Sequence, residues 1–580
     1  MSQPSKILDR LVGLETEYAI RFRPDLTGVP QSTDFRLFHT LLRSVKDEVL
    51  TVDAKHLKEG VFTANGGALW FERVRYAGGH GLLEGSTPEC RGAREAVCYQ
   101  RAQDRLLTEA CMNAAVAGEL TLIKNDRDSQ DNVYGAQENY ELTLSGLLLL
   151  YWRVGLVCLL PFMMFGLLGI IGLLIGFLVY FVLAWIIYAC LLPFEMKFSS
   201  SKRSRLYQFL LGDDATGRIQ TGAWLPEWLE EWSNNLTRVA LFPIAVGLWA
   251  LAKVCYRKYI RVLTPFLISR PLMVGAGRVA SDGFYLADKA HVTNCIVGYN
   301  GLVGDRPLFS IGHFLKTLCL DVWTSPREYF ECFNCRQRIQ VCIGDSNMAE
   351  EAEYLRVGTT LLVLDAVDAG TLKNPPIVKR PIRALRQICE DPSLNQTVRC
   401  RGRRELSAIE IQRYYWRSCR EMLDAREDVS DEAEDIMARW IDVLDKLEHG
   451  EQDELVGRID WVTKRFLLDA RDDDSVNEDE SDEKKSRRKI DLKYHQLSTD
   501  GYFERLKSTG VVTQLLDEDE VDRAIRTAPA NTPATTRGQF IREFSRGPEA
   551  LTVNWNKIVI GSGLRKKVMR LSEFGRRGKT

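Results

Sequence analysis

Alternating apolar and polar positions predict β-strands in the first part of the chain. Between Gly13 and Ile20, period-two spacing puts Leu14, Thr16, Tyr18 and Ile20 on one face and Glu15, Glu17 and Ala19 on the other. After a turn signal at residues 65–67, a second alternating segment places Ala68, Trp70 and Glu72 on one face. Neighbouring carboxylates repel each other unless a cation neutralises them. The first strand therefore predicts either a Mg²⁺ or basic partner for Glu15 and Glu17, or simply a solvent-exposed face.

Helical spacing of apolar residues dominates most of the remaining polar sequence. The pattern predicts helices over residues 35–49 and 92–117, and a mostly helical region over 351–470. The segment Asp472–Arg488 is a run of charged residues, and we interpret it as a solvated, flexible loop. A strand over 338–343 ends in Gly344-Asp-Ser-Asn347, which either contributes Asp345 or Asn347 to a substrate site or is an ordinary strand-to-helix turn.

One long segment has no charged side chain at all. Val154–Phe194 is 41 residues without charge, which as a helix is about 60 Å long, twice the thickness of a bilayer core of about 30 Å. We therefore predict two membrane spans, 147–168 and 172–193, with the turn near the glycines of Gly169–Gly176. A second apolar run, 239–252, is shorter, and we interpret it as an interfacial or core helix; whether it enters the membrane stays open.

The charges around the apolar segment predict its orientation. Basic residues flank it at Arg153, Lys197, Lys202, Arg203 and Arg205, which by the positive-inside rule predicts a cytoplasmic catalytic domain. If the segments on either side of the insert share one sheet, the chain must cross the membrane an even number of times. The alternative is a buried hairpin in a soluble protein.

Composition excludes several classes of function. The 580 residues carry a formal net charge of -1, which gives no general attraction to nucleic acid. The 14 cysteines lack paired spacing, as is typical of a reducing compartment, and Cys332 and Cys335 form a single CxxC without the second pair that a zinc site needs. No apolar run of signal-peptide length occurs in residues 1–10.

A set of ordered sequence blocks resembles the Pup ligase and depupylase family (PafA and Dop). The blocks are GLETEY from Gly13, NGGALWFE from Asn65, TPEC from Thr87, the 124–140 block ending in QENY, LTPFLISRPLMVGAGRV from Leu263, IGDSNMAE from Ile343, RVGTTLLVLD from Arg356, LSAIEIQRYY from Leu406, IDWVTKR from Ile459, KIDLKYH from Lys489 and TTRGQFIREF from Thr535. They extend over nearly the whole chain in family order, so the resemblance is far more specific than any single motif.

The resemblance implies an α+β fold similar to glutamine synthetase and other carboxylate-amine ligases, in which a curved antiparallel sheet backed by helices holds ATP and metal. The blocks divide the chain into catalytic parts at 1–142 and 262–498, a membrane insert at 143–261, and a small C-terminal domain at 499–580. They also imply ATP and Mg²⁺ as cofactors, a Pup-like modifier and target-protein lysines as partners, and a connection to a proteasome system.

Matching positions imply roles for five residues. Glu15 and Glu84 correspond to metal-binding glutamates of the family, Thr87 and Trp555 to nucleotide contacts, and Glu72 to the position of the catalytic base. Each of the two nucleotide contacts has a plainer alternative, because Thr87 could cap a helix and Trp555 could belong to the core.

The chain also departs from the family pattern. The family has Arg-Leu-Tyr-x-Asp where this chain has Ala68, Trp70 and Glu72, and a histidine where it has Gln137. The separation of Glu15 and Asn65 by 50 positions is closer to the ligase than to the depupylase spacing. The resemblance thus favours an ATP-dependent ligase that joins the C-terminal glutamate of a Pup-like modifier to lysine at the membrane. The alternatives are a depupylase- or deamidase-type hydrolase, and a degenerate membrane protein that only binds nucleotide or modifier.

Overall fold

The computed structural model describes residues 6–25, 32–54, 59–73, 80–124, 127, 133–191, 209–210, 226–298, 304–312, 328–474, 480–547, 550–561 and 566–571. Its centre is an 11-stranded sheet with the order β11-β12-β13-β8-β1-β5-β4-β3-β2, and β6 and β7 also pair with β1. The strands are β1 Leu11–Pro24, β2 Thr51–Asp53, β3 Gly60–Thr63, β4 Ala68–Arg73, β5 Gly81–Ser86, β6 Cys90–Arg91, β7 Gly118–Ile123, β8 Ala136–Thr143, β11 Cys295–Val297, β12 Pro307–Ile311 and β13 Arg336–Val341. The predicted antiparallel sheet is confirmed, except that β11 and β12 pair in parallel.

Helices cover one face of this sheet. The alternation in β1 buries Leu14, Thr16 and Tyr18, and these side chains meet α2 (Ala93–Met112), where Thr16 and Tyr18 form hydrogen bonds to Gln100 and Asp104. The other helices described in the body are α1 Asp34–Glu48, α6 Arg257–Ser269, α7 Lys289–Val292, α10 Glu328–Glu331, α11 Glu350–Ala369, α12 Pro381–Cys389, α13 Ala408–Asp424, α14 Asp431–His449, α15 Asp460–Asp474 and α16 Glu480–Tyr494. The helix predicted over 35–49 and the mostly helical region over 351–470 are confirmed, and the helix predicted over 92–117 forms but ends at Met112.

The prediction of a flexible loop over 472–488 is wrong for the residues that the structure describes. Residues up to Asp474 belong to α15 and residues from Glu480 to α16, while 475–479 lie outside the described residues. Glu, Lys and Arg are good helix formers, so a run of charges can continue a helix on a solvated surface.

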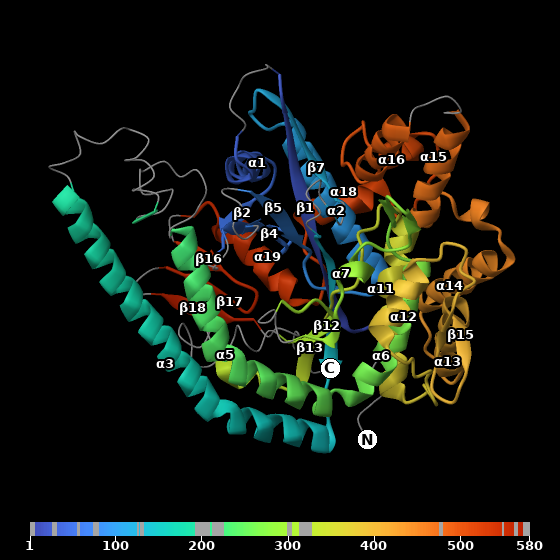
Figure 1. The fold of residues 1–580 in the computed structure, drawn as a ribbon, viewed down its shortest axis with the longest axis horizontal. Coiled ribbons are helices and arrows are strands. Elements are labelled where there is room, and N and C mark those ends of the chain that lie inside the picture. Colours follow the sequence, from blue (N-terminus) through green and yellow to red (C-terminus); the bar gives the residue numbers. More distant parts are fainter. Residues whose placement is uncertain are drawn as a thin grey trace.

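The apolar insert forms a hairpin of two helices that differs from the predicted one. α3 is a single helix, Gly146–Leu191, that runs through the expected turn at 169–176, so the division into spans 147–168 and 172–193 is wrong. Its partner is α5, Glu227–Cys255, which contains the 239–252 run. Residues 192–208, with their basic side chains, lie outside the described residues. Figure 1 shows α3 along the outer edge of the molecule with α5 beside it on the inner side.

Glycines explain why the turn did not form where the sequence suggested it. A Cβ on Gly166 would lie 3.0 Å from Ile244, and one on Gly169 would lie 3.0 Å from Ala240, so these positions bring α3 and α5 into close contact. In apolar helix pairs, small residues commonly serve this packing role rather than breaking the helix.

The C-terminal segment contains α17 Tyr502–Ser508, α18 Glu518–Arg526, α19 Pro533–Phe544 and a sheet of β16 Leu551–Val553, β17 Lys557–Ile560 and β18 Lys567–Arg570. Its α19 and β16 pack on the β2–β4 part of the sheet, whereas its α18 packs against α2 and its α17 against α16. The segment also meets the β3–β4 turn, where Asn65 donates a hydrogen bond to the Ala524 carbonyl (2.9 Å). Gly66 in this turn has φ +86°, and a Cβ there would lie 2.8 Å from the Ala534 side chain. The turn is therefore fixed by both conformation and close packing.

Candidate active site

The sheet face opposite the helices carries a group of carboxylates on three adjacent strands. In the registered pairs, Glu17 lies opposite Glu84 and Glu84 lies opposite Trp70. Directly opposed residues of antiparallel strands project to the same side, and so do residues two apart on one strand. Glu15, Glu17, Glu72 and Glu84 therefore share one face, which we call the carboxylate face. Strand register thus brings the predicted site acids Glu15, Glu72 and Glu84 to one side of the sheet, while their roles stay predictions.

Neighbouring amides hold the first two acids in place. Glu15 accepts hydrogen bonds from Asn139 Nδ2 (3.1 Å) and Gln340 Nε2 (2.9 Å), and Glu17 accepts one from the Gly135 backbone N–H (2.7 Å). Both donors to Glu15 are neutral amides, so they orient this carboxylate without neutralising its charge.

The donor set fits a Mg²⁺ ion shared with phosphate. Within the described part of the chain, no three acidic, histidine or cysteine side chains form a ready-made metal cage. Glu15 lies opposite Ser86, two residues from Glu84, so the two acids are diagonal neighbours on adjacent strands. Mg²⁺ is usually held by one or two carboxylates together with substrate phosphates and water, rather than by an all-protein cage. Glu15 and Glu84 supply the two carboxylates that such a site takes from the protein.

Thr87 is part of the framework under this face. Its hydroxyl accepts a hydrogen bond from the Leu14 backbone N–H (2.9 Å), and its own N–H donates to the Leu14 carbonyl (2.9 Å). The alternative that Thr87 caps a helix is wrong, because α2 begins after Gly92. A nucleotide contact from this residue stays a prediction.

Trp555 reaches the carboxylate face from the C-terminal domain. Its ring lies edge-on to Phe62 with centroids 5.1 Å apart, and the Arg537 guanidinium lies 4.6 Å from its centroid. Arg537 is fully buried, donates to the Gly66 and Trp555 carbonyls (2.9 and 3.1 Å) and pairs with Glu89. Arg537 thus joins the β3–β4 turn to the segment that carries Trp555.

Two departures from the family pattern have a packing role. Ala68 and Trp70 belong to a small apolar cluster with Val52, Phe62, Ala64, Ile541 and Val553 between the sheet and the C-terminal domain. Trp70 meets Phe62 edge-on at 5.4 Å. Where the family places a guanidinium and a phenol, this chain therefore has apolar contact. The third departure, Gln137, accepts a hydrogen bond from Gln340, which also binds Glu15.

The Asp345–Asn347 segment is a structural turn. Asp345 accepts hydrogen bonds from the backbone N–H groups of Asp288 (2.6 Å) and Lys289 (3.2 Å), and Asn347 accepts one from Gly275 (2.7 Å). Both side chains are buried. Of the two readings of this motif, the strand-to-helix turn is the one these contacts support.

The sequence did not single out Asn139, Gln340, Arg537 or Glu89. Asn139 and Gln340 lie directly opposite each other on the adjacent strands β8 and β13, so the face they share could be assigned only once the pairing of these strands was known. Arg537 is 471 positions from its partner Gly66 along the chain, and no local pattern signals such a contact.

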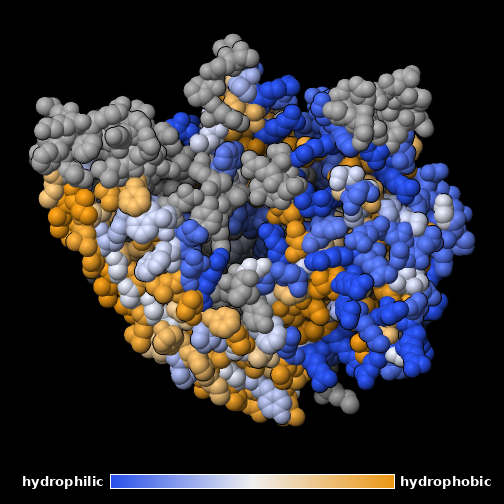
Figure 2. Space-filling view, in the orientation of Figure 1, coloured by the Kyte–Doolittle hydropathy of each residue, from blue (hydrophilic) through white to orange (hydrophobic). Residues whose placement is uncertain are grey.

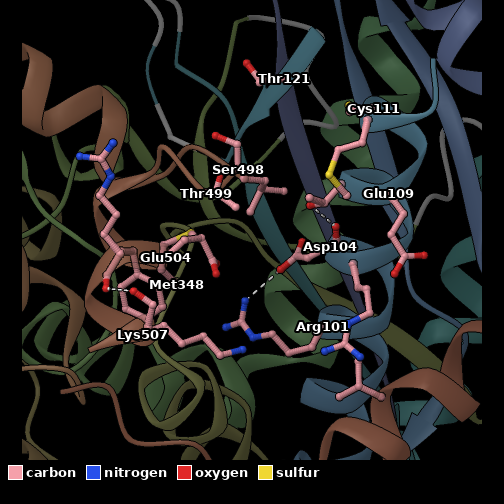
Figure 3. A pocket seen from close by; sticks show the side chains of 18 of the residues that line it. Arg101, Asp104, Glu109, Cys111, Thr121, Met348, Ser498, Thr499, Glu504 and Lys507 are labelled. Carbon is pink, nitrogen blue, oxygen red and sulfur yellow. Dashed lines mark hydrogen bonds and ion pairs between the residues drawn. The ribbon is translucent and has the colours of Figure 1, made fainter. Parts of the chain in front are cut away.

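On the helix side of the sheet, a buried charge network ties β1 to α2. Asp104 accepts hydrogen bonds from Tyr18 (2.6 Å), Lys124 (2.9 Å) and Arg101 (2.9 Å). Burial would raise the pKa of Asp104, but Lys124 and Arg101 hold it below its ordinary value. Figure 3 shows Asp104 and Arg101 in the wall of a cavity of about 920 Å³. This cavity lies behind α2 and does not contain the carboxylate face.

Replacing Asp104 by asparagine is expected to destabilise the protein by about 3–5 kcal/mol at pH 7, because two buried cations lose their partner. A lowered folded-state pKa means that the carboxylate stabilises the fold above its unfolded pKa and that this contribution is lost as pH falls. The loss should therefore shrink in acid. Urea unfolding at pH 7 and at pH 3 or below, under the ordinary pKa of an aspartate, measures it. Asp522→Asn, which breaks an exposed pair with Arg105, is a control expected to cost less than about 1 kcal/mol. Equal losses for both variants would contradict the network's role.

Comparison with known proteins gives one consistent relationship. A family model described as Pup-ligase protein matches residues 10–559. A Pup--protein ligase of Mycolicibacterium smegmatis is 31% identical over 319 residues, and one of Acidimicrobium ferrooxidans is 28% identical over 331 residues. The alignments cover 54% and 55% of this chain and 66% and 67% of those proteins, about two thirds of their length.

Solved structures support the fold. The ligase PafA in complex with the prokaryotic ubiquitin-like protein Pup aligns with a TM-score of 0.64 at 20% identity, covering 98% of this chain and 90% of that one. PafA in complex with ADP aligns with a TM-score of 0.59 at 19% identity, covering 96% and 94%. The predicted fold class is therefore confirmed.

Proposed function

Because the chain belongs to the Pup-ligase protein family, we propose that it is an ATP-dependent ligase that joins the C-terminal glutamate of a Pup-like modifier to a lysine amine of a target protein. One observation carries this proposal. Glu15, Glu72 and Glu84 come from strands β1, β4 and β5 onto a single face, next to an aromatic residue of the C-terminal domain. The related PafA structures bind Pup and ADP, respectively.

The chemistry needs an activated acyl group, because a carboxylate has no good leaving group at neutral pH. In the proposed reaction a carboxylate oxygen of the modifier attacks the γ-phosphorus of ATP, and ADP leaves. The lysine amine then attacks the acyl carbon, and phosphate leaves with the original carboxylate oxygen. Mg²⁺, when bound, would neutralise phosphate charge, and Glu15 and Glu84 are the residues that would hold it.

Glu72 is the proposed base. An amine attacks only when it is neutral, so the lysine ammonium must first lose a proton to a nearby acceptor. Glu72 is two residues from Trp70, which lies directly opposite Glu84, so its carboxylate projects on the same face as the metal-binding pair. That position allows it to accept the proton beside the activated acyl group.

The experiment that separates this function from its alternatives uses the purified full chain, ATP, Mg²⁺ and a synthetic Pup-like peptide ending in Gly-Gly-Glu, with a lysine-rich target. ADP together with a peptide–target conjugate supports ligation. Release of peptide from a preformed conjugate, with no new conjugate formed, supports a hydrolase. If neither a conjugate nor released peptide forms, the protein is not a catalyst of either reaction, and only a binding role is left.

Replacing Trp555 by alanine is expected to raise the KM for ATP about tenfold or more, since stacking of a base on an aromatic ring is worth about 1–3 kcal/mol. Trp555→Phe keeps a ring and should preserve most of the affinity. Thermal unfolding of both variants controls for the lost contact with Phe62. An unchanged KM in a folded Trp555→Ala protein would remove Trp555 from the nucleotide site.

We also propose that α3 and α5 attach the enzyme to a membrane on its cytoplasmic side. Both helices are long and apolar enough to enter a bilayer. Exposed large apolar side chains cover α3 along its length, and Figure 2 shows this apolar surface on the lower left beside a hydrophilic body. A soluble surface rarely exposes an apolar area this extensive. Membrane lipid and a proteasome system that receives the conjugates are further proposed partners.

A further inference from the structure

Both ends of α5 lie against the catalytic body. Near its start, Glu230 forms an ion pair with Arg73 at the end of β4 (4.0 Å). Just beyond its end, the Tyr259 hydroxyl donates a hydrogen bond to Asp368 (2.6 Å) and contacts the Thr143 carbonyl at the end of β8 (3.2 Å). Arg73 and Thr143 belong to the same sheet, and Asp368 belongs to α11 of the same body, so the two ends of α5 are both held at the catalytic body.

The length of α5 makes this contact pattern incompatible with a membrane crossing. Its 29 residues extend about 43 Å at 1.5 Å per residue, which exceeds a bilayer core of about 30 Å. A helix that crosses the core separates its ends by the full thickness of the membrane. A water-soluble sheet domain on one side could then contact only one of the two ends.

α3 follows α5 along the same surface. Gly155, Gly166 and Gly169 of α3 lie against Leu251, Ile244 and Ala240 of α5 in antiparallel order. At the far end, the Tyr180 ring meets the Trp228 ring with centroids 5.5 Å apart. α3 is therefore held at one helix diameter from α5, on the side away from the body, as Figure 1 shows.

The outward side of α3 is apolar from Val154 onward; its only charged residue, the exposed Arg153 near its start, donates a hydrogen bond to the Phe333 carbonyl. Its strongly exposed side chains include Leu147, Phe165, Leu168, Leu174, Leu178 and Trp185. The two ends of α5 carry tryptophan and basic side chains. Trp228 and Trp232 lie near its start and Lys253 near its end, and Arg257 and Lys258 follow at the start of α6. Tryptophan and basic residues favour the headgroup region, and cations pair with anionic headgroups.

From these observations we infer that the α3–α5 hairpin is a monotopic membrane anchor. It lies in the plane of one leaflet, with α3 among the acyl chains and α5 at the level of the headgroups. The inference rests on the proposed membrane attachment and changes its form, since neither helix crosses the bilayer. The end of α3 at Leu191 and the start of α5 at Glu227 then lie on the same side of the membrane as the catalytic domain.

The test uses the full-length protein bound to the outside of vesicles of phosphatidylcholine and phosphatidylserine, with the exposed cysteines Cys158, Cys190 and Cys335 replaced by serine. Flotation measures binding, and Ser199→Cys is labelled with a membrane-impermeant maleimide. We expect the protein to float and residue 199 to be labelled equally before and after detergent. Labelling only after detergent would show a spanning hairpin and overturn the inference while leaving membrane attachment intact. Failure to float would overturn both.

Cross-linking on the same vesicles gives an independent readout. A short bis-maleimide should join the pair Arg73→Cys/Glu230→Cys, which the structure places in contact. The matched pair Arg73→Cys/Val254→Cys, with Val254 exposed near the opposite end of α5, should not cross-link. Absence of the first cross-link in floated protein would show that α5 leaves the body in the membrane and would contradict the in-plane arrangement.

Discussion

Replacing Glu72 by glutamine is expected to lower kcat for conjugation by about 10²- to 10⁴-fold, the usual contribution of a positioned general base. Glutamine keeps the shape of the side chain on β4 but cannot accept the lysine proton. The KM for ATP should change little, because the nucleotide is held by other residues. Steady-state conjugation with varied ATP and varied target measures both constants.

Two further variants sharpen this prediction. Glu72→Asp keeps the charge but withdraws it by one methylene, and a displacement of about 1 Å in a positioned group can cost on the order of a hundredfold. Glu119→Gln removes a carboxylate at the rim of the same sheet, where it pairs with Arg23, and should leave kcat unchanged. Turnover of Glu72→Gln equal to that of Glu119→Gln would show that Glu72 is not the base.

Replacing Glu84 or Glu15 by glutamine is expected to lower kcat/KM at fixed Mg²⁺ by about 10²- to 10³-fold. Neutralising phosphate charge is worth several kcal/mol, and about 1.4 kcal/mol corresponds to a factor of ten. Glu15 and Glu84 are diagonal neighbours on β1 and β5, so removing either leaves the ion with one carboxylate. Titration of activity with Mg²⁺ should show a rise in the concentration needed for half-maximal rate.

The metal dependence distinguishes this defect from loss of the base. Excess Mg²⁺ should restore part of the activity of Glu15→Gln and Glu84→Gln by mass action, but none of the activity of Glu72→Gln. If excess Mg²⁺ fails to help either metal-site variant and their half-maximal concentration is unchanged, the two glutamates do not bind the ion.

Local periodicity was sufficient to predict the parts of the site that lie on strands. In β1 the alternation alone separated Leu14 and Tyr18, which are buried, from Glu15 and Glu17 on the opposite face. In β4 it placed Trp70 and Glu72 together. The alternation does not show which strands pair. Only the register of β5 between β1 and β4 brings Glu84 opposite Glu17 on one side and Trp70 on the other.

The hairpin and the C-terminal contacts could not be predicted in the same way. The glycines and the long uncharged run predict a turn within 169–176. Whether a glycine ends a helix or packs against a second helix depends, however, on residues far away in the sequence. Here those residues are Ala240 and Ile244 of α5. Likewise, Arg537 connects Gly66 to Trp555 through contacts between distant segments of the chain. Such contacts are set by tertiary packing, which leaves no local signal.

The most direct test of the proposed chemistry follows the oxygen atoms of the modifier. A synthetic Pup-like peptide with ¹⁸O in its C-terminal carboxylate is conjugated by the full chain with ATP and Mg²⁺, and the released phosphate is analysed by mass spectrometry. An acyl phosphate on the carboxylate face predicts one ¹⁸O in each phosphate and one phosphate for each conjugate. Conjugate formed with unlabelled phosphate, or ATP consumed without conjugate, would contradict the account.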